Sequence, residues 1–441
     1  MPKTNTKYQR RLLWLKRWIW VYFWLLIFEG VLRKWIVPSL SGPLLLVRDP
    51  VAVMIYIQAY RCQKFSIKTM WPFALLTAGM FLLASTQIVL GINTIPIALY
   101  GIRSYALHLP LIFVMADTLT REDLHKCGRW LLLLSVPMTI LVLAQFRAGA
   151  GAWLNAGAGE GSSQIMSAGN HVRPAGTFSY DIGPQCLVML TFGFIVDALM
   201  RKGTYPRWLL YPALFAAVAS VPILGSRTVL FTMAALGVFT VYSGMSHAAR
   251  LAGLVKIAAV LLLAGFIAIQ LPFFRDAVGT MEDRWQQASR AEGNVGEVLD
   301  ERVLGNVEGG LQSVGTTPWL GSGIGMGSNF AAVTMTGEAR FMLGEGEWVR
   351  IIPEFGPICG LLFLGARMCF AGYLFLMGLN GLRRNSALGW LLLPAVIPLL
   401  VMGVMEQPTY LGFMVFGAGL CLAAAQVAIR PVVFTSSQAL S

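Results

Sequence analysis

Two arginines lie at positions suited to binding a phosphate group. Arg227 lies in the run LGSRTVLF (224–231), and Arg173 begins the run RPAGTF (173–178). A guanidinium group presents a planar fork of donors that matches phosphate oxygens, and an arginine among apolar residues is costly unless it meets an anion or water. Both arginines are therefore candidates for binding an anion such as a phosphate group. The alternatives are that Arg227 reaches to a membrane surface and that Arg173 pairs with Asp181.

A dense group of charges occupies the run GEGEWVRIIPEFG (344–356). On a helix that begins there, Glu347, Arg350 and Glu354 share one face, because they are spaced by three and four residues. A carboxylate can orient or deprotonate a hydroxyl group while a neighbouring arginine binds an anion. Glu345 or Glu347 is therefore a candidate general base, and Arg350 is a candidate binding residue. The alternative is a salt-bridged start of a helix.

Further arginines and a glycine-rich run lie between these groups. The run DRWQQASR places Arg284 and Arg290 on either side of Trp285, which suits a pyrophosphate or a charged sugar. The same pattern suits an amphipathic helix on a membrane surface. The run GSGIGMG (321–327) resembles a phosphate-binding loop only superficially, because no Lys-Ser or Lys-Thr pair follows it. A tight structural turn is the better interpretation of this run.

Ionisable residues also lie inside apolar segments. Arg48 and Asp49 are adjacent, and they can pair with each other or with Glu29 and Arg103 of neighbouring segments. Such residues are functional candidates by default, but a structural network is the favoured interpretation here. The four histidines and six cysteines show no metal-binding spacing. The sequence therefore predicts neither a metal site nor a cofactor.

The elements that must position these residues are membrane-spanning helices. Of the 441 residues, 56% are hydrophobic and only 12% are charged, whereas a soluble domain carries about 25% charged residues. A span needs about 20 mostly apolar residues. This criterion predicts an all-α, polytopic membrane protein with about twelve transmembrane helices, near 18–32, 43–60, 70–90, 95–117, 130–147, 183–200, 206–224, 228–245, 251–273, 351–379, 386–405 and 408–428.

The distribution of basic residues predicts the topology. Lysines and arginines gather in the N-terminal segment and after every second helix, which places both termini in the cytoplasm. Two long segments then face outward, at 148–182 and at 274–350. The chain divides into helices one to nine (1–273), a large outward loop (274–350), and helices ten to twelve with a cytoplasmic tail (351–441). The formal charge of +13 thus reports topology and not a nucleic-acid partner.

The order of the short runs resembles one known family. RPAGTF precedes a mid-chain helix, and LGSRTVLF follows it further along the chain. A long outward loop ends in PWLGSGIGMG, and GEGEWVRIIPEFGPICG opens the next helix. This combination is similar to the O-antigen ligase and O-antigen polymerase superfamily of bacterial envelope glycosyltransferases. The resemblance covers most of the chain.

The resemblance implies a GT-C-like helical glycosyltransferase of the bacterial inner membrane. Such enzymes take a glycan from undecaprenyl diphosphate at the periplasmic face, without a metal or a nucleotide sugar. Arg227 matches the arginine that holds the donor diphosphate, Arg173 matches a second basic residue, and Arg284 is a further candidate. The ligase branch carries a histidine in a run like His-Asn-x-Tyr-Leu near the end of the loop, where this chain has Glu345 or Glu347.

This departure favours a polymerase over a ligase. The expected function is polymerisation of lipid-linked repeat units of an O-antigen, exopolysaccharide or capsule, with the bilayer and a chain-length regulator as expected partners. The alternatives are a ligase that transfers glycan to lipid A core or another acceptor, and a flippase or other transporter. A structural subunit of a polysaccharide assembly complex is a further alternative. The two halves of the chain do not match each other, whereas those of many carriers do.

Overall fold

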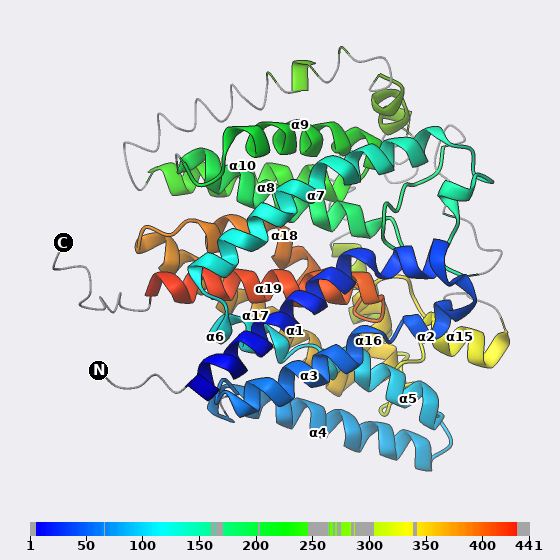
Figure 1. Cartoon of the computed structure of the whole chain (residues 1–441). Helices are drawn as coiled ribbons and strands as arrows, with labels where there is room; N and C mark the ends of the chain where they lie inside the picture. Colours follow the sequence, from blue (N-terminus) through cyan, green and yellow to red (C-terminus); the bar gives the residue numbers. More distant parts are fainter. Residues whose placement is uncertain are drawn as a thin grey trace.

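The computed structural model of the chain is all-helical, as expected from the sequence (Figure 1). The structure describes residues 6–65, 67–159, 164, 171–201, 203–245, parts of 263–286, 304–337 and 342–429. The first half of the chain forms α1 (Thr6–Val31), η1 (Leu32–Ile36), η2 (Pro38–Leu40), α2 (Ser41–Leu44), α3 (Arg48–Arg61), α4 (Ile67–Val89), α5 (Ile95–Ile102), η3 (Arg103–Leu107), α6 (Leu111–Thr118) and α7 (Arg121–Arg147).

The second half continues with helices on both sides of the expected outward loop. Its described elements are η4 (Trp153–Asn155), α8 (Ile182–Met200), α9 (Arg207–Leu224), α10 (Arg227–Met245), α14 (Gly305–Ser313), α15 (Asn329–Thr336), α16 (Glu347–Phe355), α17 (Pro357–Arg383), α18 (Leu388–Met402) and α19 (Pro408–Ile429). The segment 274–350 therefore contains α14, α15 and the beginning of α16.

Within the described residues, nine helical segments are long and apolar enough to cross a membrane, so the chain is a multi-pass membrane protein. The expected count of twelve is not confirmed. The predicted span at 18–32 lies in α1, which carries basic residues along its first half and Glu29 near its end. The span at 386–405 corresponds to α18, which has 15 residues. The span at 251–273 lies largely outside the described residues.

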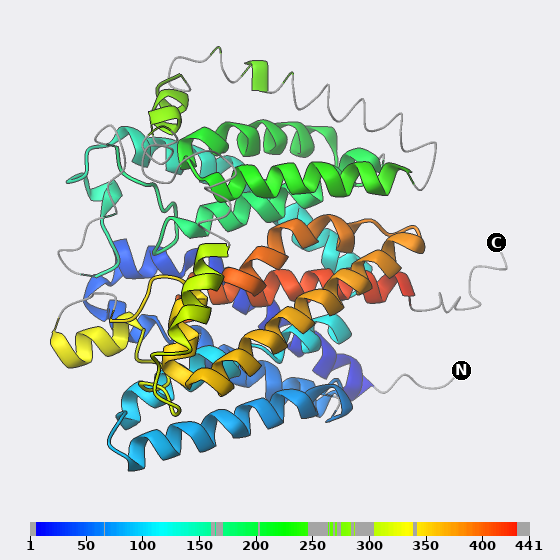
Figure 2. The same cartoon turned by 180° about the vertical axis from the view of Figure 1, so that it is seen from behind.

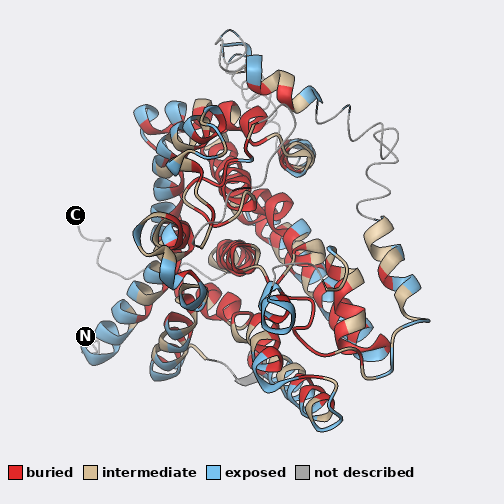
Figure 3. Ribbon diagram, turned by 90° about the vertical axis from the view of Figure 1, so that its right-hand side faces the viewer, coloured by how far each residue is buried: buried red, intermediate tan, exposed pale blue. Residues whose placement is uncertain are grey.

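Two helices form the centre of the bundle. α8 and α19 are buried over most of their length, and α19 packs against α6, α8, α17 and α18. Both have apolar residues on all sides, which is the pattern of a helix enclosed by others. By contrast, α4 and α10 bury only a minority of their apolar residues and present the remainder outward. Figure 3 shows this contrast between the buried interior and the exposed outer helices.

The end of α1 holds the segment that contains RPAGTF. The Thr177 hydroxyl donates to the Ile27 carbonyl at 2.7 Å, and the Lys34 amine donates to the Gly176 carbonyl at 2.6 Å. Gly30 lies directly against the backbone of Thr177 and Phe178, where a Cβ atom would clash. A residue without a side chain is therefore required at this point of α1, and the contact fixes the backbone that carries Arg173.

We expect Gly30→Ala to destabilise the protein by about 1–3 kcal/mol, because the added methyl group must push α1 away from the 176–178 backbone. Thermal unfolding of the purified protein in detergent measures this effect. Gly79→Ala in α4 is the matched control, since a Cβ atom there meets nothing within 4 Å. Equal unfolding temperatures for the two variants would contradict the close packing at Gly30.

Candidate functional site

The runs that the sequence singles out lie at one end of the helical bundle, opposite the end where α1 begins and α19 ends (Figures 1 and 2). Two contacts support this arrangement. The Ser226 hydroxyl donates to the Gln185 side chain at 2.7 Å, which joins the starts of α8 and α10. The ring of Phe178 lies 5.5 Å from that of Phe413 near the start of α19. Segments far apart in the sequence therefore meet at this end.

The run GSGIGMG, called the glycine loop below (321–327), binds a carboxylate of its own chain. The amides of Gly325 and Gly327 donate to the two oxygens of Glu354 at 2.9 and 2.8 Å. The amide of Ser322 donates to the Pro353 carbonyl at 2.6 Å. Gly321, Gly323 and Gly325 have positive φ angles, a conformation that glycine adopts readily. The loop is thus a tight turn bound to α16, in agreement with the structural interpretation.

The side-chain amides of Gln87 and Asn93, which the sequence analysis did not single out, also hold the glycine loop. Gln87 donates to the carbonyls of Leu320 and Glu354 at 2.6 and 3.0 Å, and it accepts from the Ile324 amide at 2.9 Å. Asn93 donates to the Ile324 carbonyl at 2.9 Å. These contacts span more than 200 residues of sequence, so no local spacing indicates them.

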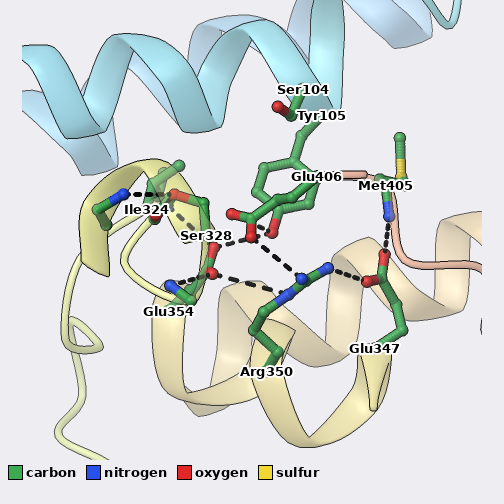
Figure 4. Close-up of polar contacts among 12 residues, drawn as sticks. Ser104, Tyr105, Ile324, Ser328, Glu347, Arg350, Glu354, Met405 and Glu406 are labelled. Carbon is green, nitrogen blue, oxygen red and sulfur yellow. Dashed lines mark hydrogen bonds and ion pairs between the residues drawn. The ribbon is translucent and has the colours of Figure 1, made fainter. Parts of the chain in front are cut away.

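Five ionisable side chains and Tyr105 form a buried group beside the glycine loop, called the charge cluster below, and Figure 4 shows all of them except Arg367. All are at most 5% exposed. Its members are Glu347, Arg350 and Glu354 of α16, Tyr105 of η3, Arg367 of α17 and Glu406 of the turn 403–407.

Arg350 lies at the centre of the charge cluster. It pairs with Glu347 on its own helix and with Glu406 at 3.0 Å, and its Nε atom lies 3.9 Å from Glu354. The expectation that Glu347, Arg350 and Glu354 share one face of a helix is confirmed. A buried charge is costly unless it is paired, and Arg350 has three carboxyl groups as neighbours.

Glu347 and Glu345, the two candidate bases, have different surroundings. Glu347 is fully buried and pairs with both Arg350 and Arg367. Arg367 in turn donates to the carbonyls of Leu400 and Gly403 at 2.8 and 2.9 Å. Glu345 is exposed. These contacts give Glu347 and Arg350 structural roles within the cluster, and they leave Glu345 as the accessible carboxylate of the pair.

Of the candidate arginines outside the charge cluster, Arg227 begins a helix and Arg173 lies in the segment that precedes α8. Arg227 is the first residue of α10 and is partly buried. Arg173 is exposed and lies 4.0 Å from Asp181, which agrees with the pairing considered from the sequence. Asp181 immediately precedes α8. Arg284 lies outside the described residues.

A second buried group, called the arginine cluster below, confirms the structural network expected from the sequence. Arg48 donates to Glu29 at 3.0 Å, and Arg103 donates to Asp49 at 2.7 Å. Arg33, which the sequence analysis did not include, binds Ser179 at 2.9 Å and lies 3.4 Å from Glu29. This cluster connects α1, α3 and η3 with the segment that follows RPAGTF.

A search against models of known protein families finds no match to this chain, and a search of curated proteins finds none. The resemblance to the O-antigen ligase and polymerase superfamily therefore rests on the short runs described above.

We expect Glu347→Gln to destabilise the protein by about 3–5 kcal/mol, because the neutral amide leaves Arg350 and Arg367 as buried charges without this partner. Thermal unfolding in detergent is the measurement. Glu345→Gln is the control, since Glu345 is exposed and should unfold at the wild-type temperature. If Glu347→Gln matched this control, the ion pairs of Glu347 would not stabilise the fold.

Proposed function

We propose that this protein polymerises undecaprenyl-diphosphate-linked oligosaccharide repeat units at the periplasmic face of the inner membrane. The observation that supports this proposal is the gathering at one end of the bundle of RPAGTF, the LGSRTVLF run, the glycine loop and α16. The same four runs carry the resemblance to the glycan polymerases and ligases. A common location is what a shared substrate site requires.

The positions of the two arginines suit a diphosphate. Arg227 begins α10, and Arg173 lies beside Asp181 at the start of α8. A helix start presents unpaired amides and a partial positive charge, which favour a phosphate group together with an arginine. We assign to Arg227 and Arg173 the stabilisation of the charge that develops on the leaving diphosphate. Arg284 is retained as a further candidate in the long loop.

The reaction is a displacement at the anomeric carbon of the donor sugar, with inversion. A hydroxyl oxygen of the acceptor forms the new bond to this carbon while the bond to the diphosphate oxygen breaks, and undecaprenyl diphosphate leaves. Glu345 takes the proton of the acceptor hydroxyl or orients it. Glu347 and Arg350, which the sequence also suggested as base and binding residue, hold the adjacent helix in place. The reaction uses no metal or cofactor.

The proposal extends to location and partners. The nine candidate spans place the chain in a lipid bilayer. The distribution of basic residues supports cytoplasmic termini, which puts the end of the bundle with Arg173 and Arg227 on the periplasmic side. The proposed protein partner is a chain-length regulator or another polysaccharide assembly protein.

We expect deletion of the gene to reduce surface polymer to single repeat units on undecaprenyl diphosphate. Gel separation of surface glycans and lipid-linked intermediates from the deletion strain and its parent tests this. Full-length polymer that accumulates on the lipid carrier would instead identify a ligase. Repeat units that remain on the cytoplasmic face would identify a flippase and contradict the enzyme.

We expect Arg227→Ala to lower polymer synthesis by about 100- to 1,000-fold while the protein stays in the membrane, because a preorganised donor to the leaving group is lost. Complementation of the deletion strain, with protein quantified in membranes, measures both effects. Arg207→Ala is the matched control, since Arg207 begins α9 at the opposite end of the bundle and is exposed. Normal polymer from Arg227→Ala would remove Arg227 from the proposed site.

A further inference from the structure

One hydroxyl group in the charge cluster contacts two carboxyl groups. The Tyr105 oxygen lies 2.9 Å from Oε2 of Glu354 and 3.1 Å from Oε1 of Glu406 (Figure 4). A phenolic hydroxyl has a single proton to donate, and it can accept a second hydrogen bond. If both carboxyl groups were ionised, one of these two contacts would bring two oxygens together without a proton between them. The geometry therefore requires a proton on one carboxyl group.

The donors around each carboxyl group indicate which one is ionised. Glu354 accepts from the amides of Gly325 and Gly327, one on each oxygen, in addition to the Tyr105 contact. Hydrogen bonds of this kind stabilise a carboxylate. No backbone amide donates to Glu406 among the described residues, and its cationic neighbour is Arg350 at 3.0 Å. Glu354 is thus the better place for the negative charge.

The net charge of the cluster also indicates one bound proton. With all groups ionised, Glu347, Glu354 and Glu406 outnumber Arg350 and Arg367, which leaves an excess negative charge among buried side chains. One proton on Glu406 makes the cluster neutral. An unbalanced charge among buried side chains is costly, so the neutral state is favoured.

We propose that Glu354 and Glu406 together bind one proton and that this proton resides on Glu406. The proton completes a chain of hydrogen bonds that links the turn 403–407, α16 and the glycine loop. Protonated Glu406 donates to Tyr105, and Tyr105 donates to ionised Glu354. Glu354 in turn holds the amides of the glycine loop. This inference concerns the charge cluster alone and does not depend on the proposed function.

The electrostatic surroundings agree with this assignment. Glu354 and Glu406 lie outside the candidate spans. Burial, the Glu354 carboxylate and Glu347 raise the pKa of Glu406 well above its ordinary range, against the attraction of Arg350. Burial also raises the pKa of Glu354, against Arg350, the two amides of the glycine loop and Tyr105. On the side of α5, the Tyr100 hydroxyl lies 3.4 Å from the backbone carbonyl of Glu406.

A raised pKa gives a defined pH dependence of stability. The folded state binds the proton of Glu406 more tightly than the unfolded state does, so this contribution is complete below the ordinary range of a glutamate. It is lost as the pH rises from that range to the raised pKa. Stability relative to a variant that lacks this titration should therefore fall as the solution becomes more alkaline.

Infrared spectroscopy of the purified full chain in an ester-free detergent tests the proposal. We expect a protonated-carboxyl C=O band at neutral pH that shifts on transfer to heavy water. The band should be absent from Glu406→Gln and present in Glu345→Gln, the exposed control. A wild-type spectrum without the band would overturn the proposal, and this measurement requires no variant to fold. Loss of the band in Glu354→Gln together with its retention in Glu406→Gln would overturn the assignment to Glu406.

The pH dependence of thermal unfolding provides a second readout. Glutamine resembles a protonated glutamate, so the unfolding temperature of Glu406→Gln relative to wild type should rise from acidic to alkaline pH. A constant difference between the two proteins would contradict a shared proton. Tyr105→Phe should retain the infrared band but shift it, because the carboxyl group keeps its proton and loses its acceptor.

Discussion

Arg350 sets the strongest constraint on this end of the molecule. This residue is only 2% exposed in an apolar bundle, so its guanidinium group must remain paired in the folded state. Two of its partners, Glu347 and Glu354, lie on its own helix, but the third, the carboxyl group of Glu406, comes from the turn between α18 and α19. Pairing Arg350 therefore fixes where α19 begins relative to α16, and Glu354 transfers the same constraint to the glycine loop.

The arginine cluster fixes the start of α19 from the other side. Arg48 donates to the Pro408 carbonyl and also binds Glu29 of α1. Gly412 lies directly against the Arg48 guanidinium, so Arg48 packs closely on this turn of α19. Glu406 and Pro408, two residues apart, thus belong to different buried clusters. The central helix is held at its first turn by polar contacts and along its length by apolar packing.

Local spacing in the sequence predicts part of this arrangement. The shared face of Glu347, Arg350 and Glu354 follows from helical periodicity. The ion pairs of Arg48 with Glu29 and of Arg103 with Asp49 follow from the need to balance charges in apolar segments. Glu406, Tyr105 and Gln87 were not predicted, because their partners lie far away in the sequence. The expected count of twelve spans is not confirmed within the described residues, because α18 has 15 residues, α1 carries charge near both ends, and 251–273 lies largely outside them.

The glycine loop shows how a buried carboxylate decides where an external anion can bind. Amides that converge in this way suit a phosphate, but those of Gly325 and Gly327 already hold Glu354. A phosphate there would displace a carboxylate and leave it buried beside Glu406, which costs more than the new contacts return. The amides of Gly325 and Gly327 therefore serve to hold α16 and are not open to an external anion.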